Sequence, residues 1–192
     1  MISENCIPGR QNVCLMYAFF EEPCYLLSES GLQKSRSLRR ESTQSSLAVQ
    51  KRPPSGIEAA SRGVSHVLLV EKAPAALAAV RDNVKHAQAS CPETVFQILP
   101  GTLPECLRKL TAAAVSPDFI FADPPYAESA GLLDGILRNG DFSEWAGDAL
   151  LLWELPDYRS QLKVFPENWR LKTIRELGAS RFLLIERRKN GE

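Results

Sequence analysis

The segment FIFADPPY, residues 119–126, combines residue types that could hold an amino group. The Asp123 carboxylate and a peptide carbonyl of the turn can accept both hydrogens of that group, which favours the nitrogen lone pair as a nucleophile. The two prolines stiffen the turn because each fixes a backbone angle and lacks an N–H. Tyr126 could stack on the ring that carries the amino group, which for a nucleic-acid base is worth about 1 to 3 kcal/mol. The alternative is a structural turn, in which Asp123 caps the next helix and Tyr126 packs on the surface.

A second acid, Glu71, ends the apolar run HVLLVE at residues 66–71. In open α/β sheets, ligands bind beside the carboxyl ends of the strands, which is where both Glu71 and Asp123 are expected. An acid after the second strand of a nucleotide-binding fold accepts hydrogen bonds from ribose hydroxyls. The alternative is an exposed acid at a strand end, with no ligand.

The elements that must position these acids follow from the apolar pattern. From Gly56 onward, short apolar runs alternate with segments of helical periodicity, which predicts an α/β fold with a mostly parallel sheet and helices on both faces. The predicted strands are residues 66–71, 94–99, 119–123, 149–155 and 181–186. The predicted helices are residues 73–90, a segment around 103–110, and a segment around 133–137 that Gly140 is expected to end. The segments RLKTIRE and RFLLIER, joined by LGAS, predict an antiparallel hairpin at the edge of the sheet.

Composition sets the class of protein. The chain has 192 residues, 44% of them hydrophobic, which is enough for the core of one domain. Lys plus Arg and Asp plus Glu both number 23, so the total charge indicates neither a membrane surface nor a nucleic acid. The N-terminus does not resemble a signal peptide, and no stretch reaches the roughly 18 apolar residues of a membrane span. The five cysteines contain no C-x-x-C pair, which disfavours a metal site and favours reduced thiols. We expect a soluble, cytoplasmic protein without a membrane or metal partner.

Residues 1–54 differ from the rest of the chain. Ser, Arg, Gln and Glu dominate much of this segment and no clean periodicity is present, so we predict a divergent, poorly ordered N-terminus ahead of a domain at residues 55–192. Within it, residues 34–52 carry six basic residues, Arg39 and Arg40 among them, against one acid. This basic arm is either a solvated tail or a contact for a nucleic-acid backbone, since basic arms do both.

Three segments together resemble a known family. Residues 55–84, SGIEAASRGVSHVLLVEKAPAALAAVRDNV, followed by DFIFADPPY and later by LGASRFLLIERR, resemble the bacterial 16S ribosomal RNA guanine-N2 methyltransferases of the RsmD type. The resemblance covers roughly residues 55–188, and the combination is far more specific than any single motif. It implies the Rossmann-like fold of class I methyltransferases, with S-adenosylmethionine as cofactor. It also implies methylation of a guanine N2 amine in 16S ribosomal RNA, free or in a small-subunit particle, and we expect a monomer.

The resemblance assigns roles to individual residues. It implies that Glu71 binds the cofactor ribose, that Asp123 and Pro124 receive the target amino group, and that Asp123 also faces the cofactor. Tyr126 would stack on the flipped guanine. The nitrogen can then attack the sulfonium methyl without a covalent enzyme intermediate, so positioning would supply most of the acceleration. RNA contacts are expected at four basic residues, Arg39, Arg40, Arg62 and Arg187.

The cofactor side departs from the family pattern. The family's first strand ends in a glycine-rich loop of the type D-x-F-A-G-x-G, which lets backbone approach the cofactor. Here SLAVQKRPPSG occupies that place, so we expect the first strand and its loop to be lost or divergent, with Gly56 remaining at the edge of the cofactor site. Thr102 stands where the family commonly carries an acid near the cofactor's adenine. A shifted reading frame upstream of Ser55 would explain the abrupt change.

Two alternatives to guanine N2 methylation remain open. Turns of the D-P-P-Y type also serve amide and amine nitrogens of other acceptors, so N6-adenine or protein-glutamine methylation is one alternative. The other is a catalytically impaired, RNA-binding remnant of the family, in which the missing glycine-rich loop has abolished cofactor binding.

Overall fold

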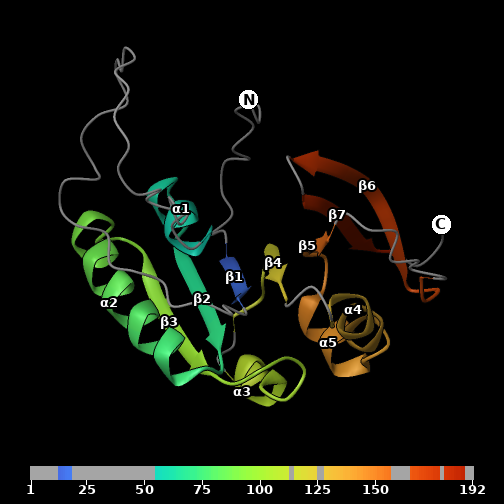
Figure 1. Cartoon of the computed structure of the whole chain (residues 1–192), viewed down its shortest axis with the longest axis horizontal. Coiled ribbons are helices and arrows are strands. Elements are labelled where there is room, and N and C mark those ends of the chain that lie inside the picture. Colours follow the sequence, from blue (N-terminus) through green and yellow to red (C-terminus); the bar gives the residue numbers. More distant parts are fainter. Residues whose placement is uncertain are drawn as a thin grey trace, which may run out of the picture.

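The computed structural model describes residues 13–18, 55–112, 115–124, 128–156, 165–177 and 180–188. Their strands form one seven-stranded sheet in the order β3-β2-β1-β4-β5-β7-β6 (Figure 1). The strands are Val13–Ala18 (β1), His66–Glu71 (β2), Val95–Pro100 (β3), Phe119–Asp123 (β4), Leu150–Pro156 (β5), Trp169–Leu177 (β6) and Ser180–Arg187 (β7). The helices are Ser55–Ser61 (α1), Pro74–Ser90 (α2), Leu107–Ala112 (α3), Ser129–Leu137 (α4) and Gly140–Ala146 (α5). β1 to β5 are parallel, and β7 runs antiparallel to both β5 and β6, so the predicted α/β class with a C-terminal hairpin is confirmed.

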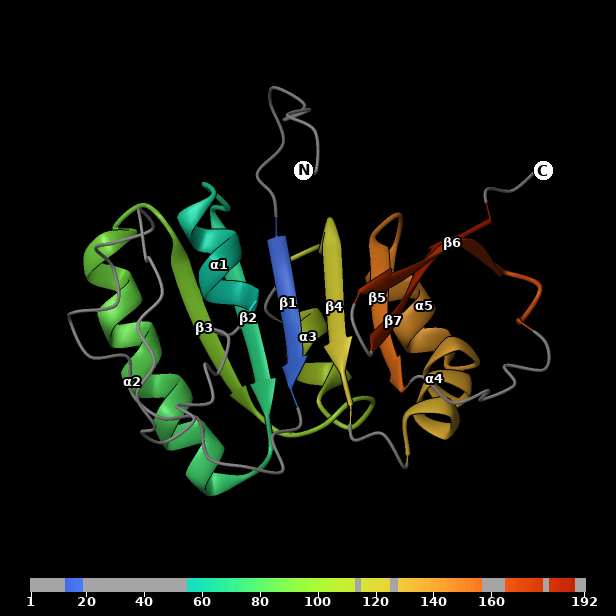
Figure 2. The ribbon, with the colours of Figure 1, turned by 45° about the horizontal axis from the view of Figure 1, so that its top comes forward.

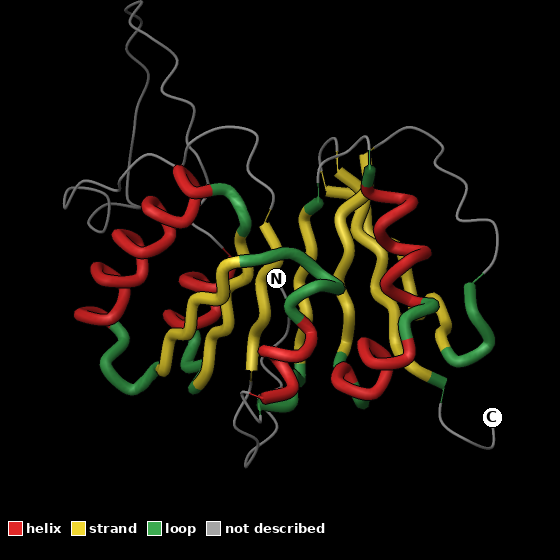
Figure 3. Tube along the Cα trace, turned by 90° about the horizontal axis from the view of Figure 1, so that it is seen from below, coloured by secondary structure: helices red, strands yellow, loops and turns green. Residues whose placement is uncertain are grey.

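Helices cover both faces of the sheet, whose strands run side by side through the molecule (Figures 2 and 3). On one face, Ala60 of α1 and Val80 of α2 pack against Leu69 of β2. On the other face, α3, α4 and α5 pack on a larger core, in which Leu133 of α4 belongs to the same buried cluster as Leu68 of β2. Successive strand residues project to opposite faces, so a strand covered on both sides has an unbroken apolar run, as β2 has in VLLV at residues 67–70.

β1 decides between the two outcomes predicted for the first strand, lost or divergent, because a strand is present but lies far from its expected place. Val13–Ala18 lies in the middle of the sheet and pairs in parallel with both β2 and β4, with Leu15 opposite Leu68 of β2. VCLMYA is an uninterrupted apolar run, which is typical of a strand in a parallel sheet. The prediction failed because it sought the strand directly before Ser55, whereas the chain places it ahead of residues 19–54.

The sheet therefore extends beyond the predicted domain of residues 55–192, because β1 is one of its central strands. Residues 1–12 and 19–54 lie outside the described residues, and this range includes Arg39 and Arg40 of the basic arm. The predicted poor order of that segment and its RNA contact stay predictions.

The helices confirm one of the sequence predictions and correct another. α2 confirms the predicted helix, since it begins with Pro74 and buries Leu77 and other apolar residues at helical spacing. The prediction that Gly140 ends a helix is wrong, because α4 ends at Leu137 and Gly140 is the first residue of α5. Asn139 causes the new start, since its Oδ1 accepts a hydrogen bond from the Phe142 N–H at 2.8 Å and caps α5.

The helices of the described ranges are too short or too polar to span a membrane. Within the same ranges, no group of three or more His, Cys, Asp or Glu side chains is arranged to hold a metal ion. Cys91 and Cys106 are free thiols, and burial raises the pKa of Cys106 to about 11, which keeps this thiol protonated at neutral pH.

Candidate functional site

Three acids lie in one row across the carboxyl ends of the parallel strands. Ala18 of β1 pairs with Asp123 of β4. Tyr17 pairs with Val70, so the next residue of β2, Glu71, lies level with Ala18. Ala122 pairs with Trp153, so the next residue of β5, Glu154, lies level with Asp123. Residues in one row of a parallel sheet project to the same face. Glu71, Asp123 and Glu154 therefore project to one face of the sheet, with β1 between the first two.

Glu71 is buried, and only one of its two carboxylate oxygens has hydrogen-bond partners among the described residues. Its side chain is only 2% exposed, and its Oε1 accepts hydrogen bonds from the backbone N–H groups of Lys72 and Ala73, each at 2.8 Å. Its Oε2 is buried and has no hydrogen-bond partner among the described residues. Burial raises the pKa of Glu71, and the two backbone hydrogen bonds oppose that rise. The alternative of an exposed strand-end acid is therefore wrong, and the open oxygen is suited to a hydroxyl donor.

The turn after β3 lies next to Glu71. Pro100 pairs with Glu71 in the sheet, and the following Gly101 donates its N–H to the Glu71 carbonyl at 3.0 Å. Gly101 has a φ of +150°, a backbone conformation that L side chains rarely adopt, and a Cβ here would lie 3.3 Å from the Cys106 Cβ. Thr102 is half-buried, and its carbonyl accepts from the Cys106 N–H at 2.8 Å. The turn thus holds Thr102 two residues beyond the Glu71 row.

Asp123 ends β4 and lies beside Glu154 of β5. Burial is the largest cause that raises the pKa of Asp123, from its ordinary value of 3.8 to about 7, and the charge of Glu154 and a side-chain hydrogen bond with it add to the rise. The first residue of α4 follows the turn, and its N-cap is Glu128, which makes no side-chain cap hydrogen bond. Asp123 therefore does not occupy the N-cap of α4, and the other part of the structural alternative, the packing of Tyr126, lies outside the described residues.

Ser129 ties the start of α4 to β5. Its side chain is fully buried, and its Oγ donates to the Glu154 carbonyl at 3.0 Å and accepts from the Trp153 indole Nε1–H at 2.8 Å. Pro124 is buried, whereas Tyr126 lies outside the described residues. The sequence reading missed Glu154 and Ser129, although an acid at the end of the apolar run ALLLWEL was a signal for the first of them.

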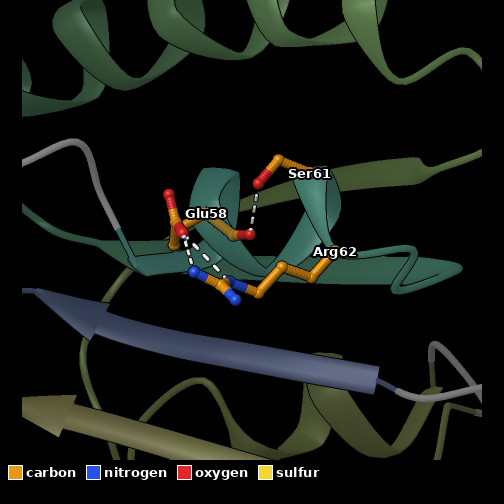
Figure 4. A network of polar contacts seen from close by, with 3 residues as sticks. All are labelled: Glu58, Ser61 and Arg62. Atoms are coloured by element: carbon orange, nitrogen blue, oxygen red, sulfur yellow. Dashed lines mark hydrogen bonds and ion pairs between the residues drawn. The ribbon is translucent and has the colours of Figure 1, made fainter. Parts of the chain in front are cut away.

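The remaining predicted residues lie elsewhere. Gly56 is buried in the first turn of α1. Arg62 follows α1 with its side chain 75% exposed, and its guanidinium contacts Glu58 Oε1 through Nη2 at 2.7 Å and through Nε at 3.0 Å (Figure 4). Arg187 is half-buried and donates through Nη1 to the Ser143 carbonyl of α5 at 3.0 Å. The structure does not bring these two arginines into the row of acids, and their RNA contacts stay predictions.

Comparisons with known proteins were consistent with this fold. The family model described as Conserved hypothetical protein 95 matches residues 54–186, and no curated protein matches the chain. A hypothetical protein of Thermus thermophilus superposes with a TM-score of 0.50 and 22% identity over 68% of this chain and 67% of that one. The Escherichia coli protein yhhF gives 0.48 and 22% over 69% of each chain. The 16S rRNA methyltransferase RmtF, solved with S-adenosyl-L-homocysteine, gives 0.42 and 17% over 70% of this chain and 52% of that one. The similarity to the Thermus protein shows a shared fold.

Proposed function

The chain belongs to the family described as conserved hypothetical protein 95, the family of the RsmD-type methyltransferases that its sequence resembles, and from this membership we propose a specific activity. The protein transfers a methyl group from S-adenosylmethionine to the exocyclic N2 amine of a guanine in 16S ribosomal RNA. The observation that carries the proposal is the row in which Glu71, with one open buried oxygen, stands two strands from Asp123. In this proposal the protein acts in the cytoplasm as a monomer, on free 16S RNA or on a small-subunit particle.

The residues at the ribose end suit this cofactor. Glu71 keeps one oxygen on two backbone N–H groups, so its second oxygen has a fixed direction and can accept from a ribose hydroxyl. Thr102 follows the neighbouring strand and would lie toward the base. Two strand spacings separate Glu71 from Asp123, which is about 10 Å. When bound, S-adenosylmethionine supplies an electrophilic methyl group on a sulfonium.

The acceptor end is built for a planar amine. The Asp123 carboxylate and the Pro124 carbonyl accept the two amine hydrogens, which orients the nitrogen toward the methyl group. Pro124 is buried and cannot donate a hydrogen bond from its backbone, so the turn offers acceptors without a competing donor. Tyr126 stacks on the guanine ring and holds it outside its own stack.

Cofactor binding tests the first half of the proposal. Isothermal titration with S-adenosylmethionine should show micromolar affinity for the wild-type chain, and Glu71→Gln should weaken it about tenfold, because one charged hydrogen bond to a hydroxyl is lost. Asp134→Asn is the matched control, since Asp134 is a surface acid of α4 whose only described pairing is with Arg138. Equal affinities in the wild type and Glu71→Gln would contradict the role of Glu71.

Methyl transfer tests the second half. Incubation with 16S RNA and labelled cofactor, followed by nucleoside mass spectrometry, should give N2-methylguanosine. Asp123→Ala should abolish the transfer, and unchanged transfer by this variant would refute the acceptor mechanism. N6-methyladenosine or methylglutamine as product would replace the guanine assignment with one of the alternatives.

A second candidate is a non-catalytic, RNA-binding remnant of the family. It is favoured by the residues after β1, which are Phe19, Phe20 and Glu21 where the family carries a glycine-rich loop. The same titration separates the two candidates, because absence of binding at millimolar cofactor would identify the remnant. Salt-dependent binding of 16S RNA by such a chain would then remain.

A further inference from the structure

Glu154 and Asp123 form a pair of carboxyl groups at the acceptor end of the row. Trp153 lies opposite Ala122 in the register of β4 and β5, so the next pair of residues is Asp123 and Glu154, and both project to the same face. Their side chains lie close enough for Glu154 to act on Asp123 through its charge and a side-chain hydrogen bond. Two carboxylates cannot hydrogen-bond to each other, so this bond forms when one of the two groups carries a proton.

The fold fixes the position of Glu154 independently of Asp123. Ser129 Oγ donates to the Glu154 carbonyl at 3.0 Å, and this hydroxyl is in turn held by the Trp153 indole at 2.8 Å. Ser129 and Trp153 are buried in the core, with exposed fractions of 0% and 1%. The end of β5 is therefore held against α4, and Glu154 keeps its place beside Asp123.

Among the described residues, Glu154 is the charged group that acts on Asp123. On the β1 side, Ala18 lies opposite Asp123, and on the β7 side Phe182 lies opposite Glu154. The next residue of β7, Arg181, lies opposite Leu155 and donates to Glu176 at 2.9 Å. From α4, the contact with Glu154 is made by the uncharged Ser129 hydroxyl.

We infer that Glu154 is a positioning residue of the acceptor site, whose carboxylate beside Asp123 makes Asp123 a proton acceptor for the target amine and shares the proton once Asp123 has taken it. For its chemistry this inference rests on the proposed function. As the amine nitrogen attacks, an N–C bond forms and the S–C bond breaks, and the sulfonium becomes a neutral thioether. The nitrogen then carries one proton too many, and its N–H electron pair returns to nitrogen as that proton moves to the Asp123 carboxylate. The hydrogen bond to Glu154 holds the proton there until it leaves to solvent.

This assignment predicts the ionisation of the resting site. With both carboxyl groups ionised, Asp123 can accept the amine proton, and with one proton in the pair it cannot. Methyl transfer should therefore rise with pH through about 7 in the wild-type chain, where Asp123 titrates. Glu154→Gln removes the neighbouring charge but retains the shape, so the pKa of Asp123 should fall by roughly one unit or more.

The experiment is a titration of Asp123 by carboxyl-carbon NMR in full-length protein labelled at aspartate, with Asp123→Asn identifying the resonance. The wild type should titrate near pH 7, and the titration in Glu154→Gln should move to lower pH, with the acid limb of kcat/KM for methyl transfer moving by the same amount. Asp134→Asn is the control and should leave the titration of Asp123 unchanged. If Glu154→Gln does not fold, Glu154→Asp, which keeps the charge on a shorter side chain, should shift the titration partway.

The outcomes separate this inference from the proposed function. A titration of Asp123 that is the same in the wild type and both Glu154 variants would overturn the inference, whether or not the chain methylates RNA. A titration that moves, in a chain that binds no cofactor and transfers no methyl group, would leave the coupled pair standing and overturn the proposed function. An acid limb that stays in place while the NMR titration moves would overturn the proton-acceptor role.

Discussion

Replacing Asp123 with asparagine should stabilise the protein at alkaline pH. The pKa of Asp123 is raised from 3.8 to about 7 in the folded chain, because burial and Glu154 both disfavour its charged form. The folded chain therefore holds a proton that the unfolded chain has already lost between these two pH values. The contribution of Asp123 to stability is full below pH 3.8 and is lost as the pH rises through about 7. Asparagine has the same shape and no charge at any pH, so it avoids this loss.

The size of the effect follows from the same numbers. A pKa that rises from 3.8 to about 7 corresponds to about 4 kcal/mol at 1.36 kcal/mol for each unit. Asp123 is half-buried, so solvent screens part of the interaction, and we expect about 2 kcal/mol.

Urea denaturation at several pH values measures this difference directly. The free energy of unfolding of Asp123→Asn minus that of the wild type should be small in acid and should grow to about 2 kcal/mol above neutrality. Asp134→Asn, a change of the same chemistry on the surface of α4, should show no such growth, because Asp134 is half exposed and forms only an ion pair with Arg138. A difference between Asp123→Asn and wild type that is constant with pH would refute the proposed environment of Asp123.

Three further substitutions test other parts of the structure. Ser129→Ala should lower the free energy of unfolding by about 2 kcal/mol, because it leaves the buried Trp153 N–H without an acceptor, and thermal unfolding with Ser129→Thr for comparison measures this loss. Gly101→Ala should cost about 1 to 3 kcal/mol, since a Cβ at φ +150° lies 3.3 Å from the Cys106 Cβ, and an unchanged urea midpoint would contradict this geometry. Arg62→Ala should change stability by less than about 1 kcal/mol, because its ion pair is exposed, yet it should lower the salt slope of RNA binding by about one if Arg62 contacts a phosphate.

The apolar pattern predicted most of the sheet but not its centre. Runs such as HVLLVE and FIFAD are mostly apolar because these strands are covered on both faces of the sheet, so the sequence predicts them as strands. VCLMYA carries the same signal, but residues 19–54 separate it from α1, and no local rule predicts so long a connection between a strand and its following helix. The prediction of a lost strand came from expecting the usual short loop.

The acids of the site were predictable in unequal degree. Glu71 and Asp123 each end an apolar run, so position along the chain was enough to place them at the carboxyl edge. The partnership of Asp123 with Glu154 depends on which strands are neighbours and on their register, which long-range pairing decides. Ser129 gives no signal in the sequence, because the sequence does not distinguish a buried serine from a surface serine. Its role becomes visible only from the hydrogen bond that it accepts from the Trp153 indole.

The two ends of the row depend on different parts of the chain, which makes their failures separable. Asp123 and Glu154 are held by β4, β5 and α4, whose apolar residues belong to one buried core that includes Trp153 and Leu133. In the proposed function, Glu71 and the turn at Gly101 bind the ribose end, and the sequence after β1 lacks the glycines that the family carries there. A chain that lost cofactor binding would therefore keep a folded acceptor end with Asp123 titrating near pH 7. Measuring cofactor affinity and the Asp123 titration on the same sample thus decides whether the sequence change after β1 has abolished cofactor binding alone or has also altered the acceptor end.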